Sequence, residues 1–347
     1  MMFAIILLVL LAISALFNLG HLVFGSGGGS KVKYSRSVGP RLEEVTVEDN
    51  NGVDKLALID VDGIISSRSM DSTGYGLVEL IKAQLKRAEE DSRVKAVILK
   101  VDSPGGEVLA SDEINREISD FQSRTKKPVI ASMGNLAASG GYYISVPCQW
   151  IVANELTITG SIGVIMHSYN YRGLMDKVGL RPETYKSGKF KDMLSGDRSP
   201  EQISPEEKAM MQHLIDETYG RFKTVVAEGR KQSYDKSKSR SDKGRELASD
   251  WADYADGRVL SGKDAYKLGF VDELGNFQKA VDRARKLAGV SAKADLVQYQ
   301  PHYDLSDIFR MFGRSEGKPA TVKVDLGIDP PKLQVGQLYF LAPTFVH

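Results

Sequence analysis

Short, mostly apolar runs alternate with amphipathic segments in the first half of the chain, and this alternation constrains the fold more than any other feature. The runs at 55–65, 94–102 and 128–133 have the length and composition of buried strands. Between them, 74–91 and 106–122 carry apolar residues at helical spacing. Strands that alternate with helices predict an α/β fold, in which helices cover both faces of a parallel sheet.

Two glycine pairs follow strands of this predicted sheet. "VDSPGG" (101–106) ends one strand, and "GNLAASGG" (134–141) follows another. Ligands of open parallel sheets bind beyond the carboxyl ends of the strands, so both turns should face one crevice. Ser139 lies in the second turn, where the glycines that follow let the main chain approach a substrate closely. The pattern predicts a serine nucleophile that faces backbone N–H donors.

A serine hydroxyl becomes a good nucleophile only when a neighbouring base removes its proton. The chain has five candidate histidines: His21, His167, His213, His302 and His347. Only His167 follows an element that is expected near the crevice. A lysine can serve instead if burial lowers its pKa towards neutrality. The segment 185–194 supplies Lys186, Lys189 and Lys191, and residue type alone does not choose among them.

Four segments, two of which contain the glycine turns, together form a pattern that is specific to one protein family. They are "VDSPGGEVLASDEI", "SMGNLAASGGYYIS", "TGSIGVIMHSYNY" and "ETYKSGKFKDMLS". A fifth segment, "DGRVLSGKDAYKLGFVDELG", follows them. Together they resemble the signal peptide peptidase A family of bacterial membrane-anchored serine proteases, over residues 55–290. The resemblance implies a Clp protease/crotonase-like sheet flanked by helices. Because the chain holds one copy of the fold, it is similar to the short form of the family.

The resemblance also implies a Ser–Lys dyad. Ser139 matches the nucleophile, and Lys191, directly before an Asp, matches the general base. Ser161 of "TGS" is expected to orient Lys191 through a hydrogen bond. The backbone N–H groups of Gly106 and Gly140 are expected to form the oxyanion hole. This agrees with the residue-level argument, since donors aimed at developing negative charge are a large catalytic term. No metal and no cofactor are expected.

The first thirty residues contain no Asp, Glu, Lys or Arg, and 1–24 is long enough to cross a bilayer as a helix. The stretch lacks the basic start of a cleaved signal peptide, so we expect an uncleaved anchor. A linker is expected over 25–51, where "GSGGGS" suits a flexible connection. We expect a single peptidase domain over 52–290 and a C-terminal extension over 291–347.

The orientation of this anchor depends on which argument is used. Lys31, Lys33 and Arg36 follow the span, and this asymmetry favours a cytoplasmic body. The family resemblance implies the opposite, with a single-pass anchor in the bacterial cell membrane and an extracytoplasmic catalytic domain. We follow the resemblance, because long domains translocate largely regardless of flanking charge. It further implies a homo-oligomeric ring in which neighbouring protomers share the dyad.

Composition excludes several functions. The net charge of +1 gives no reason to expect nucleic acid as a partner. Because Cys148 is the single cysteine, an intramolecular disulfide is excluded. We interpret Cys148 as a small buried apolar residue. The charged stretch 233–246 is expected to be a solvated insertion.

The predicted function is therefore a membrane-anchored serine endopeptidase that degrades short apolar peptides, such as cleaved signal peptides. Three alternatives stay open: a Clp-like Ser–His–Asp peptidase that uses His167, a catalytically silent membrane ring scaffold, and a crotonase-type acyl-CoA enzyme, which the membrane span does not suit. The apolar tail "VGQLYFLAPTFVH" (335–347) has two interpretations. It packs on the body as a strand or arm, or it imitates a substrate beside the catalytic site.

Overall fold

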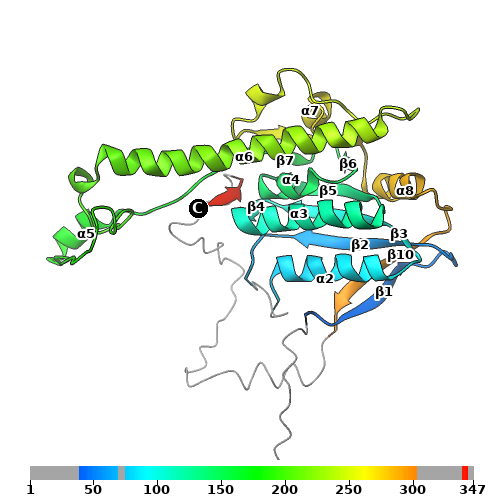
Figure 1. Cartoon of the computed structure of the whole chain (residues 1–347), viewed down its shortest axis with the longest axis horizontal. Coiled ribbons are helices and arrows are strands. Elements are labelled where there is room, and N and C mark those ends of the chain that lie inside the picture. The colour runs from blue at the N-terminus through cyan, green and yellow to red at the C-terminus, as the bar shows by residue number, and fades with distance from the viewer. Residues whose placement is uncertain (1–38, 69–74, 303–337, 343–347) are drawn as a thin grey trace, which may run out of the picture. The chain divides into compact units, whose positions relative to one another are not determined.

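The computed structural model describes residues 39–68, 75–302 and 338–342. Within this part of the chain, one sheet has nine strands (Figure 1). Its main path runs, in spatial order, through β1 (Leu42–Glu48), β10 (Asp295–Pro301), β2 (Lys55–Asp62), β3 (Val94–Ser103), β5 (Val129–Ala138), β6 (Trp150–Ala153) and β9 (Glu273–Leu274). β5 pairs with β6 through its first half and with β7 (Ile158–Gly160) through its last residues. β7 in turn pairs with β8 (Val259–Ser261).

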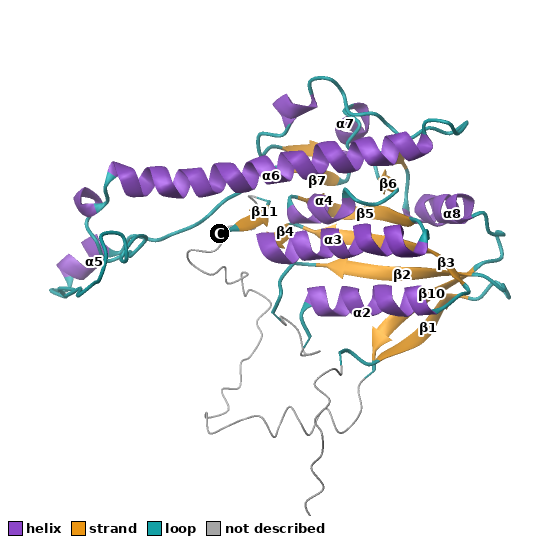
Figure 2. Cartoon of the chain, in the orientation of Figure 1, coloured by secondary structure: helices purple, strands orange, loops and turns teal. Residues whose placement is uncertain are grey.

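Most neighbouring strands of this sheet run parallel. The pairs from β10 through β9 and the pair β5–β7 are parallel, whereas β1–β10 and β7–β8 are antiparallel. Helices cover both faces, as Figure 2 shows by colour. The flanking helices are α2 (Leu77–Glu90), α3 (Val108–Thr125) and α8 (Phe277–Ala288). The predicted mixed α/β fold with a mainly parallel sheet is confirmed.

The alternation of side chains along β2 explains why two layers of helices are needed. Leu56 and Leu58 pack in one apolar cluster with residues of α8, while Ala57 and Ile59 pack in a second cluster with residues of α2 and α3. Successive side chains of a strand point to opposite faces, so a strand that is apolar throughout must be covered on both.

The sheet extends beyond the range 52–290 that the sequence pattern assigns to the domain. β1 lies in the expected linker, and β10 lies in the expected C-terminal extension. β10 pairs in parallel with β2 and antiparallel with β1. The structure therefore places two segments from opposite ends of the described chain in the same sheet.

The stretch 233–246 is not a solvated insertion throughout. Its first residues end α6 (Pro205–Ser237), and Ser237 is buried. The Gly244 N–H donates a hydrogen bond to the Ser237 hydroxyl at 2.9 Å. The Arg245 N–H donates to the carboxylate of Asp272 at 3.0 Å. These contacts fix both ends of the stretch on the body of the protein, which its polar composition did not indicate.

Residues 166–204 form a segment that we call the arm. It contains α5 (Arg172–Lys177) and the short helix η1 (Pro200–Gln202), and none of its residues is buried. Figure 1 shows α5 and the adjoining loop beyond the N-terminal end of α6, away from the central sheet. The arm therefore lacks a hydrophobic core of its own.

Among the described residues, no helix has the length and apolar character that crossing a membrane requires. The anchor expected over 1–24 lies outside the described residues, as does the first half of the expected linker.

Candidate active site

Ser139 occupies the sharp turn between β5 and α4 (Gly140–Ser145). Its backbone has a φ of 53° and a ψ of −116°, a conformation that is strained for a residue with a side chain. The Ser139 N–H donates to the Gly160 carbonyl at 2.8 Å, and its carbonyl accepts from the Tyr143 N–H at 2.8 Å. These backbone bonds hold the turn in place.

The hydroxyl of Ser139 is the unusual group of this turn. The residue is only 1% exposed, and its Oγ makes no hydrogen bond with any described residue. A buried polar group without a partner costs free energy and is uncommon in native proteins. Strain and an unsatisfied hydroxyl at one residue are features of a catalytic position rather than of packing.

The first glycine turn lies against this serine. It contains β4 (Gly105–Glu107), and Gly105 has a positive φ of 102°. A methyl group placed on Gly140 would lie 3.0 Å from the Gly106 nitrogen. The two glycine segments therefore touch, and the structure brings together Gly106, Gly140 and Ser139, as the sequence predicts.

The orientation of the Gly106 amide follows from its neighbours. The Gly105 carbonyl accepts from the Ile65 N–H at 2.8 Å, and the Glu107 N–H donates to the Ile65 carbonyl at 2.8 Å. Because bonding directions alternate along a strand, the Gly106 N–H points to the opposite edge of β4. That edge pairs with the strand Tyr339–Leu341, in which Phe340 stands opposite Gly106.

Ser161 lies close to the nucleophile through the backbone. It follows Gly160, whose carbonyl holds the Ser139 N–H. Ser161 is buried and has a positive φ of 50°, and its own N–H donates to the Arg258 carbonyl at 2.8 Å. The residue expected to orient the base is thus held rigidly beside Ser139.

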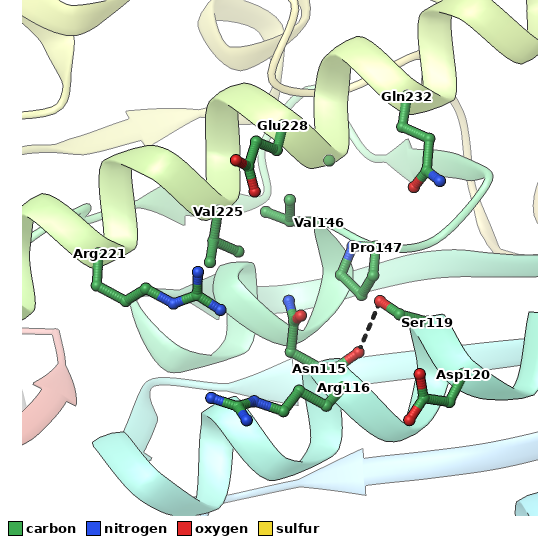
Figure 3. A pocket seen from close by; sticks show the side chains of 11 residues that line it. Asn115, Arg116, Ser119, Asp120, Val146, Pro147, Arg221, Val225, Glu228 and Gln232 are labelled. Atoms are coloured by element: carbon green, nitrogen blue, oxygen red, sulfur yellow. Dashed lines mark hydrogen bonds between the residues drawn. The ribbon is translucent and has the colours of Figure 1, made fainter.

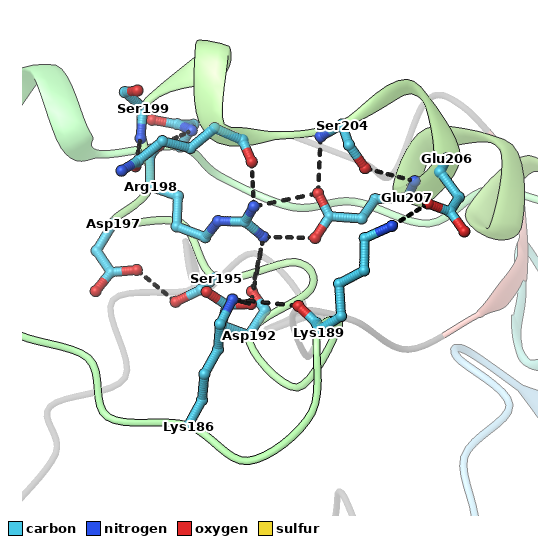
Figure 4. Close-up of polar contacts among 12 residues, drawn as sticks. Lys186, Lys189, Asp192, Ser195, Asp197, Arg198, Ser199, Ser204, Glu206 and Glu207 are labelled. Carbon is cyan, nitrogen blue, oxygen red and sulfur yellow. Dashed lines mark hydrogen bonds and ion pairs between the residues drawn. The ribbon is translucent and has the colours of Figure 1, made fainter.

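Lys191 is not brought to Ser139 within one chain. It lies on the arm and is exposed, and no ion pair joins it to a described residue. Two other lysines of this segment are paired: Lys186 with Asp192 at 2.6 Å, and Lys189 with Glu206 at 2.5 Å (Figure 4). The hydrogen bond from Lys186 lowers the pKa of the Asp192 carboxyl. Of the three lysines, Lys191 is therefore the one left free for another role.

His167, the alternative base, and the single cysteine, Cys148, both have surroundings that are unfavourable for catalysis. His167 is exposed and makes no hydrogen bond or ion pair with a described carboxylate, so the third member of a Ser–His–Asp triad is missing from this part of the chain. Cys148 is fully buried, and this burial raises the pKa of its thiol. A thiol that stays protonated is a poor nucleophile.

A cavity of about 670 Å³ opens elsewhere, between α3 and α6 (Figure 3). Its lining includes Arg116, Asp120, Arg221 and Glu228, and it contains neither Ser139 nor Lys191. Within the described residues, no cluster of His, Cys, Asp or Glu could hold a metal ion. The catalytic candidates therefore do not coincide with this pocket.

The apolar tail lies directly against the glycine turn. Residues Tyr339–Leu341 form β11, which pairs antiparallel with β4 and places Phe340 opposite Gly106. For residues 338–342 the packing interpretation is thus confirmed, whereas 335–337 and 343–347 lie outside the described residues. The substrate interpretation stays a prediction.

Two residues of the site were missed in the sequence. Tyr143, one helical turn after Ser139, and Phe222 of α6 form an aromatic pair with ring centroids 4.9 Å apart. Tyr143 stands in the "SGGYY" motif, so proximity to Ser139 was a usable signal. Nothing in the periodicity of α6 marks Phe222, because its partner is distant in sequence.

Comparisons with known proteins agree with this geometry. Residues 122–291 match the model of peptidase family S49. The chain is 37% identical over 274 residues to "Putative protease slr0021" of Synechocystis, covering 79% of this chain and 88% of that protein. It is 36% identical to "Putative signal peptide peptidase SppA" of Enterococcus faecium, covering 75% of this chain and 70% of that protein. The chain belongs to peptidase family S49, the signal peptide peptidase A family, and is a serine peptidase.

Solved structures with a similar arrangement are distant in sequence. One is a membrane-bound stomatin-specific protease in complex with a substrate peptide, at 16% identity and a TM-score of 0.41, covering 75% of this chain and 97% of that one. Another is ClpP1 of Listeria monocytogenes, at 17% identity and a TM-score of 0.38, covering 65% and 94%.

Proposed function

We propose that this serine peptidase uses a Ser139–Lys191 dyad that two copies of the chain complete together. The observation that carries the proposal is the buried, unpartnered hydroxyl of Ser139, in a strained turn beside the amides of Gly106 and Gly140. Lys191 has no ion pair with a described residue and lies on the arm, whose helix α5 lies away from the central sheet (Figure 1).

The chemistry is acyl transfer. The neutral amine of Lys191 accepts the Ser139 proton while Oγ attacks the peptide carbonyl carbon. The N–H groups of Gly106 and Gly140 stabilise the negative oxygen of the tetrahedral intermediate. The peptide C–N bond then breaks, and the leaving amine takes the proton from Lys191. Water, activated by the same lysine, hydrolyses the acyl-enzyme and restores Ser139. Ser161 holds the lysine amine in position through a hydrogen bond.

The surface of the arm supports assembly with a second copy. More than half of the large apolar side chains that are exposed in the described residues belong to the arm or the start of α6. They are Tyr169, Tyr171, Leu174, Val178, Leu180, Tyr185, Leu194 and Leu214. Contiguous exposed apolar surface is typical of protein–protein contacts. An arm that packs on a neighbouring copy buries these side chains and carries Lys191 to the neighbour's Ser139.

A mixture of two inactive variants tests the shared dyad. Ser139→Ala and Lys191→Ala proteins should each be inactive, and co-assembled oligomers should regain part of the peptidase activity. Sites that recover combine Ser139 of the Lys191→Ala chain with Lys191 of the Ser139→Ala chain. The matched control replaces Lys191→Ala by Lys189→Ala, whose lysine pairs with Glu206 and which should stay active alone.

The mixing experiment, together with single variants, decides whether the dyad is shared and which residue is the base. If verified mixed oligomers recover nothing, both residues act within one protomer and the sharing is wrong. If His167→Ala is inactive and Lys191→Ala retains activity, the Ser–His–Asp alternative replaces the dyad. If Ser139→Ala retains full activity and an active-site serine reagent fails to label the wild-type protein, the serine mechanism itself is wrong.

The location and the substrates belong to the same proposal. Residues 1–24 contain no charged side chain and would anchor the chain in the bacterial cell membrane, with the peptidase domain on the extracytoplasmic side. Short apolar peptides, such as cleaved signal peptides, are the proposed substrates, in line with the name of the Enterococcus relative. We expect deletion of residues 1–24 to abolish membrane binding. We also expect an externally added protease to degrade the peptidase domain in cells whose outer layer is permeabilised.

A further inference from the structure

We propose that Arg198 is a positioning residue for the general base, and that its guanidinium group clamps the turn that carries Lys191 onto the first turn of α6. The inference rests on the proposed function, because it takes Lys191 as the base. Arg198 acts through the position of the lysine and not on the reacting atoms. Figure 4 shows its guanidinium group between Glu207 of α6 and Asp192.

The turn that carries Lys191 is closed by short-range backbone hydrogen bonds. The Lys191 N–H donates to the Gly188 carbonyl at 3.4 Å, and the Met193 N–H donates to the Phe190 carbonyl at 3.0 Å. Gly188 and Leu194 have positive φ values of 87° and 69°, so the chain reverses sharply on both sides of the lysine. No residue of the arm is buried, so hydrophobic packing contributes little to holding this turn in place.

Two basic side chains hold the turn instead. Arg198 donates to the main-chain carbonyl of Asp192 at 3.3 Å and lies 3.6 Å from the Asp192 carboxylate. Lys186 pairs with the same carboxylate at 2.6 Å and donates to the Lys189 carbonyl at 3.2 Å. Lys189 precedes Lys191 by two positions, and Asp192 follows it directly. The backbone on both sides of the base is therefore held, while the side chain of Lys191 is exposed.

The other end of the clamp is the first turn of α6. Arg198 donates two hydrogen bonds to the Glu207 carboxylate, at 2.7 and 3.2 Å, and one to the Gln202 carbonyl. The side chains of Glu207 and Arg198 are 4% and 15% exposed, so water reaches little of this pair. A bidentate arginine–carboxylate pair fixes orientation as well as distance. The hydrogen bond from Arg198 also lowers the pKa of the Glu207 carboxyl, so the pair stays charged in a neutral assay.

The long helix α6 connects this clamp to the body of the protein (Figure 1). Ser204 and Glu207 cap its first turn: the Glu207 N–H donates to the Ser204 hydroxyl at 3.2 Å, and the Ser204 N–H donates to the Glu207 carboxylate at 2.8 Å. Further along the same helix, Phe222 is fully buried in the main apolar cluster. Contacts therefore run from the core, along α6 and through Arg198, to the turn of Lys191. Losing Arg198 should free this turn while the helix and the core stay intact.

The expected effect is on the chemical step, because a base must lie within hydrogen-bond reach of the serine hydroxyl. A misplacement of about 1 Å can cost about 10²-fold in rate. Arg198→Met should therefore lower kcat for a small apolar peptide by about 10–100-fold and change KM less than about threefold. Arg172→Met is the matched control, because it breaks an arginine–carboxylate pair with Asp176, 2.8 Å away on α5 of the same arm. It should leave kcat unchanged, and an equal fall in both variants would overturn the clamp.

Two substitutions at the start of α6 separate the clamp from the stability of the helix. Glu207→Gln keeps a side chain that suits the cap but removes the charge that pairs with Arg198, and it should lower kcat at least threefold. Ser204→Ala removes the capping hydroxyl and leaves the carboxylate, so it should lower thermal stability without changing kcat. If Ser204→Ala lowers kcat as much as Glu207→Gln does, helix capping explains the effect and the proposal is wrong.

A rescue experiment covers the case in which losing Arg198 also loosens the arm. Arg198→Ala leaves space for a small cation, and ethylguanidinium added to the assay should restore part of kcat. Ethylammonium carries the same charge but lacks the planar fork of donors, so it should restore much less. Equal recovery with the two ions, or recovery with neither, would refute the role of the guanidinium group.

The mixture of Ser139→Ala and Lys191→Ala chains shows on which chain Arg198 acts. Arg198→Met on the Ser139→Ala chain, which supplies the working lysine, should lower the recovered activity at least tenfold. On the Lys191→Ala chain, whose arm carries no base, it should change nothing. The same loss in both placements would overturn the clamp. Two other results would instead refute the proposed function: no recovery with Arg198 intact refutes the sharing of the dyad, and an active Lys191→Ala chain refutes the base.

Discussion

Gly140→Ala tests the contact between the two glycine turns. The added methyl group would lie 2.7 Å from the Ser111 Oγ, 3.0 Å from the Gly105 Cα and 3.0 Å from the Gly106 nitrogen. Ordinary carbon contacts are longer than about 3.5 Å, so the two turns must separate by several tenths of an ångström. The fold should survive, because the strain is confined to one turn.

The expected loss of activity follows from the donors that move. Separating the turns withdraws the Gly106 N–H from the position of the developing oxyanion, and losing one such donor costs about 2.7–4 kcal/mol, or about 10²–10³ in kcat. The assay is steady-state hydrolysis of a small apolar peptide, with thermal unfolding measured in parallel. Gly220→Ala is the matched control, because a methyl group there meets no atom within 4 Å.

A second substitution separates the steric effect from a general loss of structure. Ser111→Ala removes the nearest contact of the new methyl group and should restore part of the activity of Gly140→Ala. Alone, it should cost about 1 kcal/mol of stability, because the Ser111 hydroxyl donates to the Glu107 carbonyl at 2.9 Å. Activity of Gly140→Ala within a factor of five of the parent would refute the role given to these amides.

Three further predictions concern charges and the thiol. Arg230→Met should lower the free energy of unfolding in urea by about 3–5 kcal/mol, because it leaves the fully buried carboxylate of Asp272 without its charged partner. Lys231→Met on the exposed face should leave the free energy of unfolding nearly unchanged. Hydrogen bonds from lysine and arginine lower the pKa of Asp242 to about 2, beneath its ordinary 3.8. The destabilisation by Asp242→Asn should therefore be full at pH 6, stay within about 1 kcal/mol, decline below pH 3.8 and be lost as the pH falls through about 2. Because burial raises the pKa of Cys148, a thiol reagent should label it only after unfolding, even at pH 9.

The sequence predicts the central parallel strands because the signal for them is local. β2 and β3 are nearly continuous apolar runs, and the helices between them show their own period. β1 and β10 carry weaker patterns, since β1 lies at the edge of the sheet and much of its surface is exposed. Their pairing joins Leu42 to Pro301 across most of the described chain, and no local pattern encodes such a partner.

The residues of the candidate site likewise divide into those that a local sequence pattern predicts and those that it does not. Ser139, Gly106 and Gly140 were predictable because strand ends of a parallel sheet meet at one edge. The choice of Lys191 over Lys186 and Lys189 came from family resemblance alone. The structure adds a physical reason, since the other two lysines are each held by a carboxylate. The base and the nucleophile lie apart in one chain, so periodicity could not have revealed their relation.

The shared dyad and the strand β11, which pairs with β4 at the first glycine turn, make one joint prediction about mixed oligomers. In a mixture of Ser139→Ala and Lys191→Ala chains, every productive site has the glycine turns, the nucleophile and the tail of the Lys191→Ala chain. The Ser139→Ala chain contributes only its arm. β11 occupies the edge of β4 at Gly106, where an extended peptide would add a strand. Ending the Lys191→Ala chain at residue 337 should therefore raise the recovered activity.

Ending the Ser139→Ala chain at residue 337 should change nothing, because β11 pairs with β4 of its own chain. The assay is peptide hydrolysis by mixed oligomers of verified equal composition. A rise on shortening the Ser139→Ala chain instead would mean that tails cross between copies in the assembly, as the arms do. This comparison therefore shows which chain supplies the arm of a productive site and which chain supplies its tail.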